Sequence, residues 1–210
     1  MKKLLLNSLL LASLITNAQC WESISNGETH VMAIKPNGTL WGWGRGDAGL
    51  NGNGGNYTNQ PVQIGTATDW KSVHAGQQHS LGIKNSGVLW AWGANNYGNL
   101  GTGSTAMLST VPVQVGTATW KTVSAGGSHS LGIRTNGTLW GWGWNQNGTV
   151  GDGTTINKTT PVLINNSTNW KMVSCNLWRS MAVKEDGTLW GWGSNSVPLG
   201  ITSETGGQAL

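Results

Sequence analysis

The chain lacks phenylalanine, has only two tyrosines, and carries few charges: charged residues make up 10% of its 210 residues, against about 25% in an ordinary soluble domain. Its 33 glycines follow no triplet period, which excludes collagen. Its many Gly, Asn and Thr residues are poor helix formers, which excludes a long helical bundle. The 14 tryptophans and the low charge argue against disorder, which needs few aromatic residues and high net charge. The composition therefore predicts an all-β chain rich in turns.

The N-terminal apolar stretch is too short to span a bilayer. It runs from Leu4 to Ile15, follows Met1-Lys2-Lys3 and is succeeded by Ala18. A short basic start, a brief apolar core and a small residue before cleavage are typical of a signal peptide. We therefore expect residues 1–18 to be removed and the mature chain, without a membrane span, to be exported, either secreted or held at a bacterial cell envelope. The alternative is a buried N-terminal strand.

The chain also has a small net charge and only two cysteines. Without Lys2 and Lys3 the mature chain has 10 basic and 8 acidic residues, with no basic run, so we expect no nucleic-acid partner. Cys20 and Cys175 lie far apart in the chain. Export would permit a disulfide between them, and two independent thiols are equally compatible with the sequence.

Tryptophan recurs with a period of about fifty residues, which is the dominant signal in the chain. Twelve of the 14 tryptophans occupy three positions in each of four copies, and we expect them to be structural: Trp21, Trp41, Trp43, Trp70, Trp90, Trp92, Trp120, Trp140, Trp142, Trp170, Trp190 and Trp192. The repeats cover about residues 21–69, 70–119, 120–169 and 170–195. An irregular tail follows at residues 196–210.

Each repeat has the pattern of several short strands. A turn ending in Gly38, Gly87, Gly137 or Gly187 precedes each Trp-x-Trp strand, and its Asn-Gly and Asp-Gly pairs favour a type I′ hairpin turn. Alternation in the strand that follows places both tryptophans on one face and small residues on the other. A further strand is predicted at Pro61, Pro112 and Pro161, with the proline at its start.

Four short strands in every fifty residues are typical of propeller blades. The segments Ala75-Gly76-Gln77-Gln78-His79-Ser80-Leu81 and Trp92-Gly93-Ala94-Asn95-Asn96-Tyr97-Gly98-Asn99-Leu100-Gly101-Thr102-Gly103 resemble the RCC1 (regulator of chromosome condensation) repeat, and weaker copies begin at Trp43-Gly44 and Trp142-Gly143. The resemblance spans residues 21 to about 195. It implies a β-propeller, and propellers of this family typically have seven blades.

This chain departs from that pattern because it has four Trp-x-Trp strands and only three Pro-Val strands. No Pro-Val strand precedes Trp21 or follows Trp192, where the fourth copy breaks down from Asn195. We therefore expect an incomplete ring that is a truncated part of a longer repeat array. Its open blade edges would allow self-association. A closed four-bladed ring is the alternative.

The titratable residues do not form a recognisable catalytic set. His30, His79 and His129 share one repeat position with Arg179, and we expect them to bond the backbone of a neighbouring blade rather than a metal. His74 is out of register and has no carboxylate or Cys near it in sequence. There is no nucleophile elbow, phosphate loop or paired acid, so we predict neither a cofactor nor an enzyme.

Trp144 and Trp178 stand outside the repeat register. The blade plan does not require them, so we predict that they are exposed anchors for a partner, with local core packing as the alternative. The variable loops after each Trp-Gly should gather on one face. They supply five further candidate binding residues: Arg45, Asp47, Tyr97, Asn145 and Gln146.

The leading functional hypothesis is an exported scaffold that binds a protein through these loops. The sequence is similar to secreted bacterial propellers of this repeat, one of which inhibits β-lactamases. The alternative is carbohydrate binding through exposed tryptophan. A third, implied only by the family's eukaryotic namesake, is nucleotide exchange on a small GTPase, against which the signal peptide and the absence of a basic tail both speak.

Overall fold

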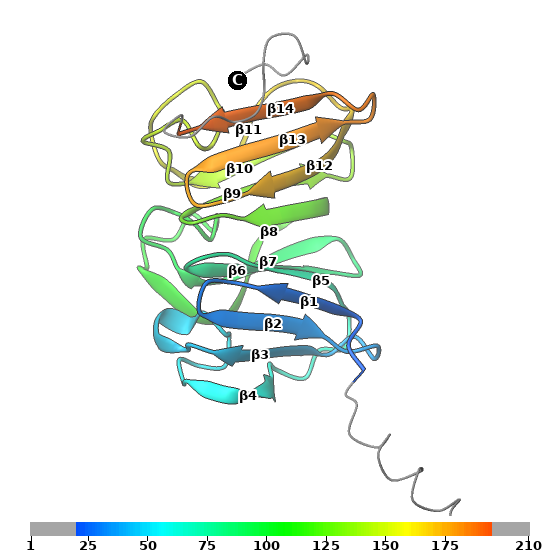
Figure 1. Ribbon diagram of the computed structural model, residues 1–210, viewed down its shortest axis with the longest axis vertical. Coiled ribbons are helices and arrows are strands. Elements are labelled where there is room, and N and C mark those ends of the chain that lie inside the picture. Colours follow the sequence, from blue (N-terminus) through cyan, green and yellow to red (C-terminus); the bar gives the residue numbers. More distant parts are fainter. Residues whose placement is uncertain (1–19, 195–210) are drawn as a thin grey trace, which may run out of the picture.

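Each repeat folds into antiparallel strands that pair in chain order, as the computed structural model of residues 20–194 shows (Figure 1). The first blade contains β1 (Ser23–Asn26), β2 (His30–Ile34), β3 (Leu40–Gly44) and β4 (Thr58–Gln63), with the 3₁₀ helix η1 (Asp47–Gly49) between β3 and β4. The second contains β5 (Trp70–Ala75), β6 (His79–Lys84), β7 (Val88–Ala94) and the first part of β8 (Leu108–Ala125). The third contains the rest of β8, β9 (His129–Arg134), β10 (Leu139–Gly143) and β11 (Lys158–Leu163). The fourth contains β12 (Trp170–Cys175), β13 (Arg179–Lys184) and β14 (Leu189–Gly193).

Strand β8 belongs to two blades. Its beginning pairs with β7, and from Trp120 onward it pairs with β9. Figure 1 shows the blades stacked in chain order, from the blue first blade to the orange fourth blade. Residues 20–194 form an open arc of blades and do not close into a ring, so the predicted all-β, incomplete propeller is confirmed. The predicted signal peptide (residues 1–18) and irregular tail (residues 196–210) lie outside the described residues.

The hairpin turns differ from the prediction. Gly38, Gly87, Gly137 and Gly187 have φ of 75°, 83°, 80° and 87°, but Ala48 is the single non-glycine residue with positive φ among residues 20–194. Type I′ needs two positive φ values, so that prediction is wrong. In the first blade the Gly38 amide donates to the Lys35 carbonyl and the Lys35 amide to the Thr39 carbonyl, as in a three-residue loop ending in a left-handed glycine.

The side chain before each of these glycines explains the choice of turn. The Asn37 carboxamide oxygen accepts hydrogen bonds from the Thr39 amide and hydroxyl, and the Thr39 oxygen accepts one from Trp41 Nε1 at 2.9 Å. Asp186 and Thr188 repeat the arrangement beneath Trp190. The turn therefore positions the first tryptophan of the strand that follows.

Two of the prolines do not lie at the start of a strand as predicted. Pro61 and Pro161 are the fourth residues of β4 and β11. Both strands are the outermost of their blades, where a missing amide proton costs no ladder hydrogen bond.

The core consists of three apolar clusters, one at each junction between blades. In the first cluster Trp70 and Trp92 of the second blade pack on Met32, Ile34 and Leu40 of the first. Tryptophans of the same blade meet edge to face, as Trp70 and Trp90 do with ring centroids 6.2 Å apart. The repeated tryptophans therefore bind each blade to the one before it.

A histidine and a serine link each pair of blades. Histidine Nε2 and serine Oγ lie 2.7 Å apart for His30 and Ser80, 2.8 Å for His79 and Ser130, and 2.9 Å for His129 and Ser180. We call these the His–Ser contacts. We expected the histidines to bond the backbone of a neighbouring blade, but each one contacts a serine side chain instead. That serine donates its proton to a backbone carbonyl of the preceding blade.

Candidate binding face

One end of every blade carries the turn between its first two strands and the loop that follows its third strand. A backbone hydrogen bond joins the two in each blade, and each is 2.8 Å long: Arg45 to Thr29, Ala94 to Gln78, Trp144 to Ser128, and Ser194 to Trp178. The variable loops therefore share one end of the arc with these turns. We call this end the loop face.

Trp144 and Trp178 meet on the loop face. Their ring centroids lie 4.7 Å apart with the ring planes tilted by 59°. Trp178 is 43% exposed, Trp144 is half-buried, and Leu177 beside Trp178 in the chain is also exposed. We call Trp144, Leu177 and Trp178 the aromatic corner. Three large apolar groups at one blade junction form a surface that can bury area against a partner.

The backbone beneath the aromatic corner is fixed by hydrogen bonds. The Trp144 amide donates to the Ser128 carbonyl, and the Trp144 carbonyl accepts from the Thr149 hydroxyl. The Trp178 carbonyl accepts from the Ser194 amide. The backbone that carries both rings is therefore fixed before any partner arrives, which lowers the entropic cost of binding.

The sequence already contained the signal for this pairing. Trp144 holds the Arg45 position of the third blade, and Trp178 holds the Thr29 position of the fourth. The backbone bonds place these two positions at the same end of a blade. In consecutive blades these two positions come together across the junction, so the pairing follows from the repeat register once the neighbouring positions are known.

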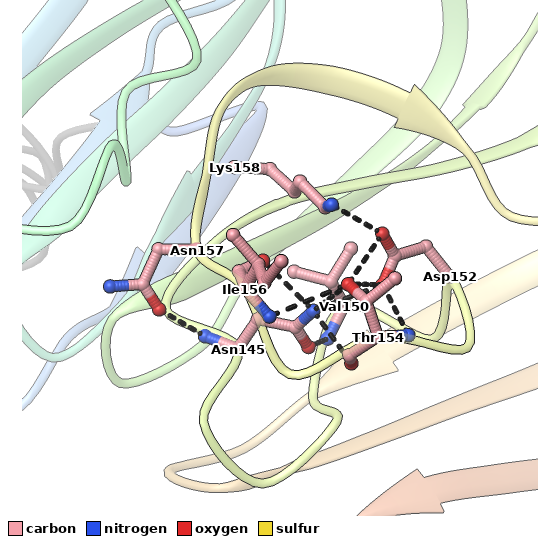
Figure 2. Close-up of polar contacts among 7 residues, drawn as sticks. All are labelled: Asn145, Val150, Asp152, Thr154, Ile156, Asn157 and Lys158. Atoms are coloured by element: carbon pink, nitrogen blue, oxygen red, sulfur yellow. Dashed lines mark hydrogen bonds and ion pairs between the residues drawn. The ribbon is translucent and has the colours of Figure 1, made fainter.

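Asn145, a candidate binding residue from the sequence, follows Trp144, but its side chain is buried and faces the interior, where a partner cannot reach it. Figure 2 shows its side chain at the centre of the loop after β10. Its Nδ2 donates to Asp152 Oδ1 and the Thr154 carbonyl at 3.0 Å and to the Ile156 carbonyl at 3.1 Å, and its Oδ1 accepts from the Val150 amide at 2.9 Å. Asn145 is thus the residue that shapes the loop carrying Trp144.

Asp152 completes this network. Its carboxylate lies 2.8 Å from Lys158 Nζ, as Figure 2 also shows. Partial burial raises the pKa of Asp152, but hydrogen bonds from Lys158, Thr154 and Asn145 outweigh it and hold the pKa below its usual value. The carboxylate is therefore committed to the loop rather than free for a ligand.

The remaining predicted residues lie on loops of three different blades. Arg45 and Asp47 form an exposed ion pair with 2.5 Å between Nη2 and Oδ2, and the Arg45 hydrogen bond lowers the pKa of Asp47. Such a pair contributes little to stability. Tyr97 and Gln146 are exposed. Of the seven predicted binding residues, contacts therefore join Arg45 to Asp47 and Trp144 to Trp178.

A series of exposed apolar residues, which was not predicted from the sequence, lies where the loops enter the fourth strand of the first three blades. They are Tyr57 in the first blade, Met107 and Leu108 in the second, and Ile156 in the third. We call this series the apolar rim. The signal was their shared place in the repeat, just before the Pro-Val strands.

A shallow hollow of about 350 Å³ lies between the turns of the four blades. The backbone of Gly27, Gly76 and Gly126 lines it, with Asn176 in the same place in the fourth blade, and Glu28 is the single charged residue of its lining. Leu177 borders the hollow and also belongs to the aromatic corner. The hollow offers backbone and apolar surface rather than a set of reactive groups.

The titratable groups are used for packing. Burial lowers the pKa of His30 and His129 to about 4 and, together with the other two histidines, that of His79 to about 3. Burial also lowers the pKa of His74. No three His, Cys, Asp or Glu residues between 20 and 194 lie close enough to hold a metal ion.

Both cysteines are free, so the disulfide that the sequence left open is not formed. Cys20 is exposed, whereas Cys175 lies against Ser124, and burial raises the pKa of its thiol to about 12. A thiol with such a pKa is a poor nucleophile at neutral pH. In the part of the chain that the structure describes, no helix is long and apolar enough to cross a membrane.

Comparison with known families finds the regulator of chromosome condensation (RCC1) repeat. Its model matches residues 37–83, 86–133 and 136–183, and a second model of the same repeat matches residues 70–99, 120–149 and 171–197. A search of curated proteins finds no match to the sequence.

Solved structures with the same fold include human WBSCR16, with a TM-score of 0.76 at 21% identity over 83% of this chain and 48% of that one. Yeast RCC1 (Prp20), in complex with Kap60, gives 0.73 at 22% identity over 82% and 43%. Prp20p from Saccharomyces cerevisiae, described with its binding to Gsp1p and histones, gives 0.69 at 21% identity over 88% and 45%. The chain thus spans less than half the length of these structures. Likeness at this level of identity demonstrates the fold.

Proposed function

The chain belongs to the family of RCC1 repeat proteins, and from that premise we propose that it is a non-enzymatic binding scaffold that engages a protein partner through the aromatic corner of its loop face. The observation that carries the proposal is the contact between Trp144 and Trp178. Neither ring is needed to build a blade, since the other three blades have different residues at each position. Both rings nevertheless meet at the surface on a fixed backbone.

The chemistry of the loop face favours a protein as partner. Tryptophan, tyrosine and methionine are enriched at protein interfaces, whereas charged residues are depleted from their centres. The aromatic corner supplies tryptophan, and the apolar rim supplies tyrosine and methionine, on loops of the same face. The ion pair between Arg45 and Asp47 lies on the first blade, away from the junction that carries the corner.

One relative, yeast Prp20, is described with protein partners in two structures. The Prp20 structures are described with Kap60 and with Gsp1p and histones, which indicates that the fold supports protein binding. Whether this chain shares a partner class with them, including nucleotide exchange on a GTPase, stays a hypothesis of family analogy. If residues 1–18 act as a signal peptide, the partner would be met outside the cytoplasm or at the envelope.

Carbohydrate binding stays the second candidate because Trp178 exposes part of its ring. A sugar ring stacks on an open, flat aromatic face. The 59° tilt between Trp144 and Trp178 presents a wedge rather than a continuous platform, which suits an apolar side chain of a protein better. A glycan array probed with the wild type and with Trp178→Ala distinguishes the two candidates.

The test of the proposal is loss of binding by corner variants. Immobilised chain would isolate a partner from an extract of the source organism, and the purified partner would then be titrated against Trp144→Ala, Trp178→Ala and the wild type. We expect both variants to bind about thirtyfold more weakly or worse, equivalent to the roughly 2 kcal/mol of an interface hot spot.

Val62→Ala on the edge strand β4 is the matched control, since it removes an exposed apolar side chain of the first blade that belongs to neither the aromatic corner nor the apolar rim. It should bind the partner with nearly unchanged affinity. Circular dichroism in the near ultraviolet would show that each variant keeps its packed core. Unchanged affinity in both corner variants would overturn the proposal.

A further inference from the structure

The three junctions between blades follow one plan. The later blade inserts a tryptophan of its first strand, a tryptophan of its third strand and a branched residue three positions after the first. The earlier blade accepts them on an apolar trio from its second and third strands. At the first junction the inserted residues are Trp70, Val73 and Trp92, and the accepting trio is Met32, Ile34 and Leu40. We call these two surfaces the insertion face and the acceptor face of a blade.

The two ends of the arc expose the two unmatched halves of this plan. The acceptor face of the fourth blade consists of Met181, Val183 and Leu189. Leu189 is 37% exposed, whereas its counterparts Leu40, Leu89 and Leu139 in the other blades are fully buried, by the next blade.

The insertion face of the first blade consists of Trp21, Ile24 and Trp43. Ile24 is 61% exposed, whereas its counterparts Val73 and Val123 are 3% and 1% exposed. The rings of Trp21 and Trp43 are partly exposed and lie 5.7 Å apart. One end of the arc thus has a surface to insert, and the other has a surface that accepts it.

Each of these two faces lacks the residue that it would contribute to a His–Ser contact. The fourth blade has Arg179 where the others have the histidine, and the first blade has Val31 where the others have the serine. A junction between these faces would bring neither a lone imidazole nor a lone hydroxyl into the interior, where an unpaired polar group is costly. Arg179 is half-buried and can extend its guanidinium to solvent.

We propose that the insertion face of the first blade in a second copy of this chain packs on the acceptor face of the fourth blade, so that two copies associate head to tail. The contact continues an interface that the chain already builds three times. Two copies joined by two such contacts have eight blades, within the range in which propeller rings close. The aromatic corner takes no part, so this proposal stands apart from the proposed function.

The test is the mass of the purified protein by light scattering over a wide range of concentration. We expect the mass of two chains for the wild type and of one chain for Ile24→Lys and for Leu189→Lys. Both substitutions change side chains that are exposed within one chain, so the near-ultraviolet circular dichroism should stay unchanged. Leu163→Lys, at an exposed leucine on the edge strand β11, is the matched control and should keep the mass of two chains.

Mixing the two variants gives the decisive result. Ile24→Lys keeps an intact acceptor face and Leu189→Lys keeps an intact insertion face, so their mixture should regain one contact and form a pair. A contact between two like faces would instead leave one of the variants paired by itself, which would overturn the proposal. So would a wild type that stays a single chain at every concentration, or loss of pairing in Leu163→Lys, which would indicate association through blade edges.

Discussion

Nε2 of His79 donates a hydrogen bond to the hydroxyl of Ser130 in the next blade across 2.8 Å. The hydroxyl has one proton and gives it to the Asn99 carbonyl at 3.0 Å, so it must accept from the imidazole. Nδ1 of His79 is then unprotonated, and it is buried without a hydrogen-bond partner. A second proton would place an unpaired charge there, which explains why burial lowers the pKa so far.

The first prediction is that acid weakens the fold well above the range in which carboxylates titrate. The pKa values of His30, His79 and His129 are about 4, 3 and 4 in the folded chain, against 6.5 ordinarily. The unfolded chain therefore binds more protons below pH 6.5, and stability is full above that pH and falls as the pH drops toward 4. Thermal unfolding followed by near-ultraviolet circular dichroism should show a lower Tm at pH 5 than at pH 7.5.

A variant identifies the source of this pH dependence. His79→Gln should be less stable than the wild type at pH 7.5 but should lose less Tm between pH 7.5 and 5, because it has one fewer buried imidazole. Asp152 and Asp186 have pKa values lowered from 3.8, so their effect belongs to more acidic conditions. A wild-type Tm that is unchanged between pH 7.5 and 5 would contradict the assignment.

The second prediction concerns the serine of the same contact. Ser130→Ala leaves the buried Nε2–H of His79 without an acceptor, and we expect it to lower the free energy of unfolding by about 1–3 kcal/mol. Urea denaturation at pH 7.5 measures this. Thr105→Ala, at an exposed loop residue of the second blade, should change stability by less than about 0.5 kcal/mol. Equal effects of the two substitutions would show that the His–Ser contact contributes nothing.

The third prediction separates two adjacent loop residues. Asn145→Ala removes the donors that hold Asp152, Thr154 and Ile156, and it should cost about 1–3 kcal/mol of unfolding free energy and weaken partner binding by loosening Trp144. Gln146→Ala, at the exposed neighbour, should leave both quantities nearly unchanged. A greater loss of partner affinity in Gln146→Ala than in Asn145→Ala would contradict this prediction.

The fourth prediction uses two glycines of one loop to separate backbone strain from crowding. Gly151 and Gly153 have φ of 86° and 75°, and a Cβ at Gly151 would lie 2.5 Å from Trp192 Nε1, whereas nothing lies within 4 Å of one at Gly153. Gly153→Ala should cost about 1–2 kcal/mol, the strain of a left-handed residue. Gly151→Ala should cost clearly more in the same urea titration. Equal costs would mean that Trp192 does not pack as the structure shows.

The fold was predictable because the sequence repeats itself at a regular spacing. Three tryptophan positions at a spacing of about fifty residues indicate a repeated unit, and short strands with glycine turns indicate a blade. The type I′ turn was wrong because the pair Asn37-Gly38 is compatible with more than one turn, and the hydrogen bonds from Thr39 to the Asn37 side chain decide among them.

The site was less predictable because it depends on contacts between repeats. Trp144 and Trp178 were identified as irregular, but their contact requires knowing which positions of consecutive blades are neighbours. Asn145 was placed correctly on a loop, yet the direction of its side chain depends on the carbonyls of Thr154 and Ile156 that converge on it. Loop sequence alone does not determine that convergence.

The most direct test of the central claim is oxidative footprinting of the tryptophans in the free chain and in its complex with the isolated partner. We predict that Trp144 and Trp178 are modified in the free chain and protected in the complex, while the buried Trp92, Trp142 and Trp192 resist modification in both. Trp144 and Trp178 remaining equally reactive in the complex would contradict the account.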